Sequence, residues 1–230
     1  MIVIGAFTFL SSCSNVIPIK GNGNIVTSEK PASAFEKISN TSSADVHFHA
    51  SDEYRVVVTV DENLDEYIEI STRNNVLNIG VKKEYNYSFT KFLVDVYCPV
   101  LTGASMTGSG TFEGVDKIIS STFESRVTGS GNIKGTIECN NFSANITGSG
   151  NVTVAGTSEN ANISITGSGN FNSSGFHIKN ATVSTTGSGN ANISVEENLK
   201  VTITGSGEIN YIGEPKVESR VTGSGRLNKR

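Results

Sequence analysis

Two histidines one residue apart are the side chains of this sequence with the spacing of a metal site. His47 and His49 flank Phe48, so in an extended strand both imidazole rings lie on the same face. Such a pair could bind a transition metal or respond to pH, but the sequence shows no third ligand beside it. We therefore interpret both histidines as surface residues of a strand and expect no metal site.

Carboxylate catalysis is a second chemistry to consider, because many right-handed β-helices act on polysaccharides. Hydrolysis needs two carboxylates at a defined separation, and lyases need clustered acids with Arg or Lys. From residue 101 to 230 the only aspartate is Asp116, and the glutamates are scattered without a repeated partner. We expect no enzymatic activity, and a carbohydrate-active enzyme is the least favoured alternative.

Aromatic side chains gather in one place, where Tyr85, Tyr87 and Phe89 precede Phe92. Their rings could stack on sugars or meet a protein partner, which makes Tyr85, Tyr87 and Phe89 candidate partner contacts. A hairpin or long loop that packs over the end of the fold would use the same residues. Both interpretations stay open.

Cysteine is the third reactive residue type. The apolar run of residues 1–10 is too short to span a bilayer and is followed by Leu10-Ser11-Ser12-Cys13, which resembles a bacterial lipobox. Residues 1–13 are therefore predicted to be a lipoprotein signal peptide with lipidation at Cys13, although no Lys or Arg precedes the apolar run. The alternative is that Cys13 is an ordinary thiol after an apolar strand.

Cys98 and Cys139 could form one disulfide or be two small buried side chains.

A tetrapeptide repeat indicates the elements that position these residues. Thr-Gly-Ser-Gly begins at seven threonines, with 18 to 21 residues between successive copies: Thr107, Thr128, Thr147, Thr166, Thr186, Thr204 and Thr222. This period suits one coil of a β-solenoid with about three short strands. We predict an all-β parallel β-helix, right-handed by expectation.

Apolar and polar residues alternate before each tetrapeptide, which is typical of a strand with one buried face. The predicted inward residues are Phe123, Val127, Phe142, Ala144, Ile146, Ala161, Ile163, Ile165, Ala181, Val183, Leu199, Val201, Ile203, Val217 and Val221. Gly-Ser-Gly would then be a corner, where glycine permits positive φ and close backbone approach. Asn after the corner would stack on Asn of the next coil as a ladder, and the terminal coils would be atypical caps.

The corners exclude two ligand classes. Phosphate-binding loops lead into a helix, whereas these seven copies lie between strands. Calcium-binding solenoids need an Asp in each turn, and the corners contain none.

A net charge of −4, spread along the chain, leaves no basic surface for nucleic acid. We expect no cofactor and no nucleic-acid partner.

The repeat and the apolar N-terminal run divide the chain into three parts. Residues 1–13 are the signal peptide and lipobox, residues 14–100 are a strand-rich part made of degenerate coils or a small sheet, and residues 101–230 are the solenoid. Strand-like runs in the second part are residues 44–49, 54–60, 75–81 and 92–97.

The sequence resembles the auto-transporter adhesin family named for its head GIN domain. The resemblance rests on Gly21-Asn-Gly-Asn24, on Phe35 with Ile38, on Asn75-Val-Leu-Asn-Ile79, on the segment from Val96 to Leu101, and on the Gly-Ser-Gly-Asn repeats. It covers residues 16 to 228 and implies an exported bacterial β-helical protein, often a lipoprotein, with an adhesin role and no catalytic residues.

The function that follows is an adhesin or binding module anchored in the bacterial cell envelope. It would be an outer-membrane lipoprotein, periplasmic or surface-exposed, that presents polar solenoid faces to a glycan or protein. The main alternative is a structural or envelope-stress protein whose solenoid packs with itself or with other envelope components.

Overall fold

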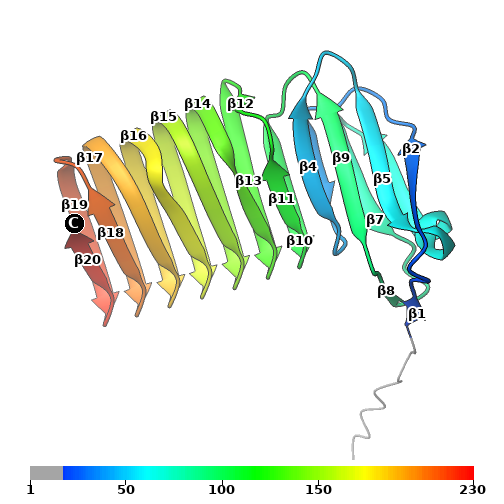
Figure 1. The fold of residues 1–230 in the computed structure, drawn as a ribbon. Helices are drawn as coiled ribbons and strands as arrows, with labels where there is room; N and C mark the ends of the chain where they lie inside the picture. Colours follow the sequence, from blue (N-terminus) through cyan, green and yellow to red (C-terminus); the bar gives the residue numbers. More distant parts are fainter. Residues whose placement is uncertain (1–17) are drawn as a thin grey trace, which may run out of the picture.

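The structure is a computed structural model that describes residues 18–230, apart from the side chain of Ser174. The predicted signal peptide and Cys13 lie outside the described residues. The fold is an elongated stack of strands, 71% strand and 3% helix, with a solenoid of about 7 turns (Figure 1). The all-β solenoid prediction is confirmed.

Long parallel strands form the coils. The complete ones are β14 (Asn132–Gly148), β15 (Asn151–Gly167), β16 (Asn170–Gly187) and β17 (Asn190–Gly205). They are preceded by β10 (Gly103–Gly108), β11 (Thr111–Gly114), β12 (Ile118–Ile119) and β13 (Thr122–Gly129). They are followed by β18 (Glu208–Ile212), β19 (Lys216–Gly223) and β20 (Arg226–Lys229). The sequence predicted about three short strands in each coil. In the complete coils one long strand takes their place, and it bends where two successive residues, such as Asn140 and Asn141, are both exposed.

The repeat sets the register between coils. Thr128, Thr147 and Thr166 are aligned partners in neighbouring strands. At the corner, Gly167 has a φ of +113°, and a Cβ there would lie 2.6 Å from the carbonyl oxygen of Gly148. Only glycine combines this backbone conformation with so close an approach, which explains why the corner recurs unchanged.

The predicted inward residues are buried in every coil except the last. Val217 and Val221 align with the buried Leu199 and Ile203, so they face inward as predicted, but they are 38% and 43% exposed and are not part of the core. The reason is that β19 pairs with β17 and with no other described strand, so no further coil covers it. The end of the solenoid is atypical, as expected, because Glu208 and Arg226 stand where the preceding coils have Asn, but no described strand covers β19.

The strands before residue 100 continue the two sides of the solenoid. On one side, β4 (Asp45–Ala50) pairs with β11 and with β9 (Phe92–Cys98), followed by β5 (Arg55–Asp61) and β2 (Ile25–Lys30). On the other, β3 (Lys37–Asn40) joins β10 to β7 (Val76–Val81) and β6 (Ile68–Arg73).

Antiparallel strands end the stack on this side. Both β5 and β6 run antiparallel to their neighbours, and the short 3-10 helix η1 (Glu62–Tyr67) lies between them. A further pair, β1 (Ile19–Lys20) with β8 (Tyr87–Ser88), lies beside this end. One continuous core fills the fold, and its largest fully buried side chains include Phe35, Phe48, Phe112 and Phe171.

Candidate functional site

Three ladders of asparagine side chains run along the solenoid. In the first, each Nδ2 donates to the Oδ1 of the preceding coil at 2.9, 2.9 and 3.2 Å, along Asn132, Asn151, Asn170 and Asn190. The second joins Asn141, Asn160, Asn180 and Asn198. The third joins Asn172, Asn192, Asn210 and Asn228. The prediction that Asn stacks on Asn is confirmed, and residues 18–230 form two further ladders besides the predicted one that follows the corner.

The second ladder forms one wall of a groove of about 760 Å³ that crosses the strands from β13 to β19. The opposite wall is the outward-facing row Ser143, Asn162, Thr182 and Lys200. Between the walls lie Phe142, Ala161, Ala181 and Leu199. Five strand spacings of about 4.8 Å give the groove a length of about 24 Å, which suits an extended polymer.

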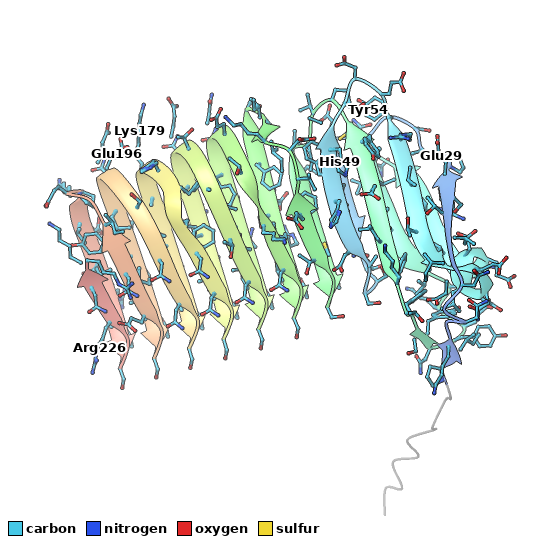
Figure 2. All side chains as sticks on the ribbon, viewed as in Figure 1. Glu29, His49, Tyr54, Lys179, Glu196 and Arg226 are labelled. Atoms are coloured by element: carbon cyan, nitrogen blue, oxygen red, sulfur yellow. The ribbon has the colours of Figure 1, made fainter. Side chains whose placement is uncertain are left out.

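The groove is uncharged at its centre and carries ion pairs at its ends. Near β13, Lys37 lies 3.3 Å from Glu124, whose pKa is lowered chiefly by a hydrogen bond from Arg126 and further by Lys37. Near β19, Lys200 lies 3.5 Å from Glu218. Other charged side chains, such as Lys179 and Glu196, project from an edge of the solenoid (Figure 2). The groove centre therefore offers amides and hydroxyls rather than charge.

The candidate partner contacts form part of a chain of aromatic rings at the N-terminal end. Tyr87 lies with its ring centre 6.5 Å from Tyr85 and 5.9 Å from Phe89, and both Tyr87 and Phe89 pack against the core. The buried Tyr87 hydroxyl has no hydrogen-bond partner among the described residues, and burial raises the pKa of Tyr87. Tyr85 is 49% exposed, so it is the ring of the three that a partner would reach most easily.

The fold also places the histidines and cysteines that the sequence singled out. His47 and His49 lie on one face of β4, as expected, and Asp95 of β9 lies between them, a residue that the sequence did not single out. The available signal was that Asp95 alternates with the apolar Val94 and Val96, so it faces outward on its strand.

Cys98 and Cys139 are free, buried thiols, and burial raises the pKa of Cys98 to about 12. They are therefore not bridged.

No helix formed by residues 18–230 has the length and apolar character needed to cross a membrane.

A family model described as "Putative auto-transporter adhesin, head GIN domain" matches residues 34–215. A comparison with curated proteins found no match.

Solved structures resemble nearly the whole chain. A putative lipid binding protein from Parabacteroides distasonis is 27% identical with a TM-score of 0.78, and the match covers 93% of this chain and 99% of that one. A putative adhesin from the same species is 25% identical with a TM-score of 0.77, covering 92% and 99%. A putative adhesin from Bacteroides fragilis is 19% identical, covers 92% and 100% with a TM-score of 0.86, and is similar in fold.

Proposed function

This chain belongs to the putative auto-transporter adhesin, head GIN domain family, and we propose that it is a non-catalytic, envelope-anchored adhesin that binds an extended glycan in its solenoid groove. The names of the family and of the similar structures support a binding or adhesin-like role and an envelope or surface location. The groove supports the choice of ligand, because a fold by itself does not determine one.

The observation that carries the proposal is the uncharged centre of the groove. Asn160 and Asn180 present amides at the regular spacing of the coils, each with one N–H that the ladder does not use, and Asn162 and Thr182 of the opposite wall add an amide and a hydroxyl. Sugar hydroxyls both donate and accept hydrogen bonds, so a repeating glycan could use the same contact in successive coils. Weak contacts repeated along a chain then add up to useful avidity.

The similar structure described as a putative lipid binding protein suggests a lipid as the rival occupant. An acyl chain would remove the Asn and Thr groups of both walls from water without satisfying their hydrogen bonds, which is costly. A protein ligand would be held by the same polar groups as a glycan. These classes are outcomes of the binding test below.

A single side chain in the groove tests the proposal. Asn162 is exposed on β15 and lines the groove, whereas Thr153 is exposed on the same strand and does not line it. The full chain, held in detergent, is applied to arrays of glycans, mucins, matrix proteins and lipids. We expect saturable binding to one glycan class, weakened at least tenfold in Asn162→Arg because the new side chain occupies the groove, and unchanged in Thr153→Arg.

Two results would overturn this proposal. Equal weakening by Thr153→Arg would place the ligand elsewhere. Silence across the array would favour the structural role described below.

The envelope anchor is proposed at Cys13, from the Leu10-Ser11-Ser12-Cys13 sequence. Acyl chains on this residue would hold the protein at a membrane, and more than one chain is needed for stable attachment. Wild-type protein should partition into the detergent phase after expression, and Cys13→Ala should stay in the aqueous phase. A soluble, uncleaved wild-type protein would refute the anchor and leave the groove proposal untouched.

A structural envelope role is a second candidate, favoured by the exposed last coil. β19 and β20 each pair on one side with a described strand, and Val221 on β19 is half-exposed. Such an edge can pair with another chain. Concentration-dependent self-association that Val221→Glu abolishes, measured by sedimentation, would support this role, and a monomer at all concentrations would oppose it.

A further inference from the structure

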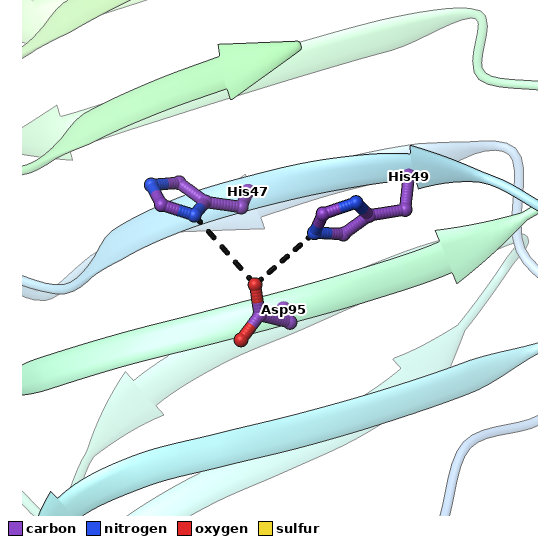
Figure 3. Close-up of side chains that lie close together, drawn as sticks. All are labelled: His47, His49 and Asp95. Carbon is purple, nitrogen blue, oxygen red and sulfur yellow. Dashed lines mark hydrogen bonds and ion pairs between the residues drawn. The ribbon is translucent and has the colours of Figure 1, made fainter. Parts of the chain in front are cut away.

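One row of side chains brings three metal-binding groups together on the side of the fold formed by β4 and β9. Asp95 is the aligned partner of His47 in the parallel pair of these strands, and His49 lies two residues farther along β4 on the same face. Figure 3 shows both imidazole rings turned toward the Asp95 carboxylate. These strands are separate from those that line the groove.

The distances suit a small divalent cation. The Oδ1 atom of Asp95 lies 3.1 Å from Nε2 of His49 and 3.6 Å from Nδ1 of His47. One ligand atom from each of the three residues lies within 4.8 Å of the other two. A tetrahedral zinc ion about 2.0–2.2 Å from its ligand atoms keeps them about 3.3–3.6 Å apart, so small side-chain rotations would close the site.

Each histidine also has a carboxylate near its other ring nitrogen. Nε2 of His47 lies 3.7 Å from Glu113, which Lys134 holds at 2.8 Å, and Nδ1 of His49 lies 4.0 Å from Asp116. Metal-binding histidines almost always donate this second N–H to such an acceptor, which fixes the tautomer and the orientation of the ring, and at 3.7 and 4.0 Å both carboxylates would have to move closer to accept it. This arrangement of outer carboxylates is the second observation that points to a metal.

Packing fixes one of the rings, and solvent reaches the site. The His49 ring stacks on Tyr97 with centres 4.8 Å apart, and Arg55 covers Tyr97 at 4.1 Å. The side chains of His47, His49 and Asp95 are 32%, 25% and 22% exposed. A bound ion could therefore enter from solvent and complete its coordination with water.

We propose that His47, His49 and Asp95 bind a divalent first-row transition metal, and that zinc is the ion that fits best. Two imidazoles and one carboxylate match the ligand types that zinc prefers and leave its fourth position to water. The three side chains come from the two paired strands β4 and β9, so the site is built into the sheet rather than carried on a loop. This inference is independent of the groove proposal.

Calorimetric titration of zinc chloride into the full chain, free of any polyhistidine tag and stripped with chelator, tests the site. The sequence has one further histidine, His177, which lies exposed on β16 and provides a matched control. We expect one zinc per chain. Affinity should fall at least tenfold in His49→Gln and in Asp95→Asn and stay unchanged in His177→Gln. Glu113→Gln should weaken binding about 10–100-fold, as changes to outer partners do.

The wild-type protein alone gives a second test that does not depend on how the variants fold. Cobalt(II) bound in place of zinc should show the visible absorption of a four-coordinate ion with nitrogen ligands, and zinc should displace it. Absence of saturable zinc binding, or an equal loss in His177→Gln, would overturn the proposal and leave the cluster as a set of ion pairs.

Discussion

Asn151 donates a hydrogen bond from Nδ2 to Oδ1 of Asn132, 2.9 Å away in the preceding coil, and its own Oδ1 accepts one from Asn170 at 2.9 Å. Asn151 thus uses both its donor and its acceptor along the solenoid axis. The interaction couples neighbouring coils through side chains as well as through the backbone.

Removal of the Asn151 amide should therefore weaken the contacts between its own coil and both neighbouring coils. Asn151→Ala deletes two side-chain hydrogen bonds and should lower the free energy of unfolding by about 1–3 kcal/mol. Urea unfolding followed by circular dichroism measures the change. Asn162→Ala is the control, because Asn162 is exposed and makes no side-chain hydrogen bond to another described residue. Equal effects of both substitutions would contradict a role for the ladder.

Corner glycines should tolerate no side chain. Gly167→Ala combines a φ of +113° with a Cβ 2.6 Å from a backbone oxygen, so we expect a loss of about 3 kcal/mol or more. Gly175→Ala is the matched control, because its nearest contact would be the Ala155 Cβ at 3.6 Å and its φ is not positive. Thermal unfolding of the two variants compares them, and similar melting temperatures would refute the account of the corner.

Asp61 should make the protein sensitive to acid. This buried carboxylate accepts hydrogen bonds from the backbone N–H groups of Gly23 at 2.9 Å, Thr90 at 2.8 Å and Lys91 at 3.4 Å. Burial, the largest single influence, raises its pKa, but the hydrogen bonds together outweigh it, and the pKa is lower than usual. The ionised form is therefore favoured in the folded state.

The sign of the effect follows from that direction. Because the folded pKa lies below the unfolded value of about 3.9, the stabilisation is complete above that pH and is lost as the pH falls through the folded pKa. Asp61→Asn should cost about 1–3 kcal/mol at pH 7, and the difference from wild type should shrink below about pH 4. Melting temperatures between about pH 2.5 and 7 test this, with the exposed Asp52→Asn as control.

The aromatic cluster should separate into a packing residue and a contact residue. Tyr87→Phe removes a buried hydroxyl that has no partner among the described residues, so stability should stay equal or rise by about 1 kcal/mol. Tyr85→Ala changes a half-exposed ring and should leave the melting temperature nearly unchanged.

Binding of the Tyr85→Ala variant to immobilised mucin and matrix proteins distinguishes the two interpretations of the cluster. If the cluster contacts a partner, binding should fall while the melting temperature holds. Intact binding together with lower stability would assign the cluster to packing alone.

The sequence by itself determined the solenoid, because a nearly constant period aligns identical residues of successive coils along the solenoid axis. The spacing of Thr147 and Thr166 was enough to predict that they stack, and the alternation around Ile163 was enough to predict which face is buried. His47 and His49 could likewise be assigned to one face of a strand from their spacing.

Only the tertiary structure decided what lies beside those residues. Asp95 comes from a strand 46 residues after His49 and reaches it because β9 pairs with β4 in a part of the chain where no period relates one strand to the next. The groove could not be predicted from the sequence either, because the depth of the groove depends on how the coils bend. Val221 shows the same limit, because its pattern is that of a core residue and only the lack of a described strand beyond β19 exposes it. Local spacing encodes the face on which a side chain lies, whereas the neighbour across that face is set by how distant strands pair.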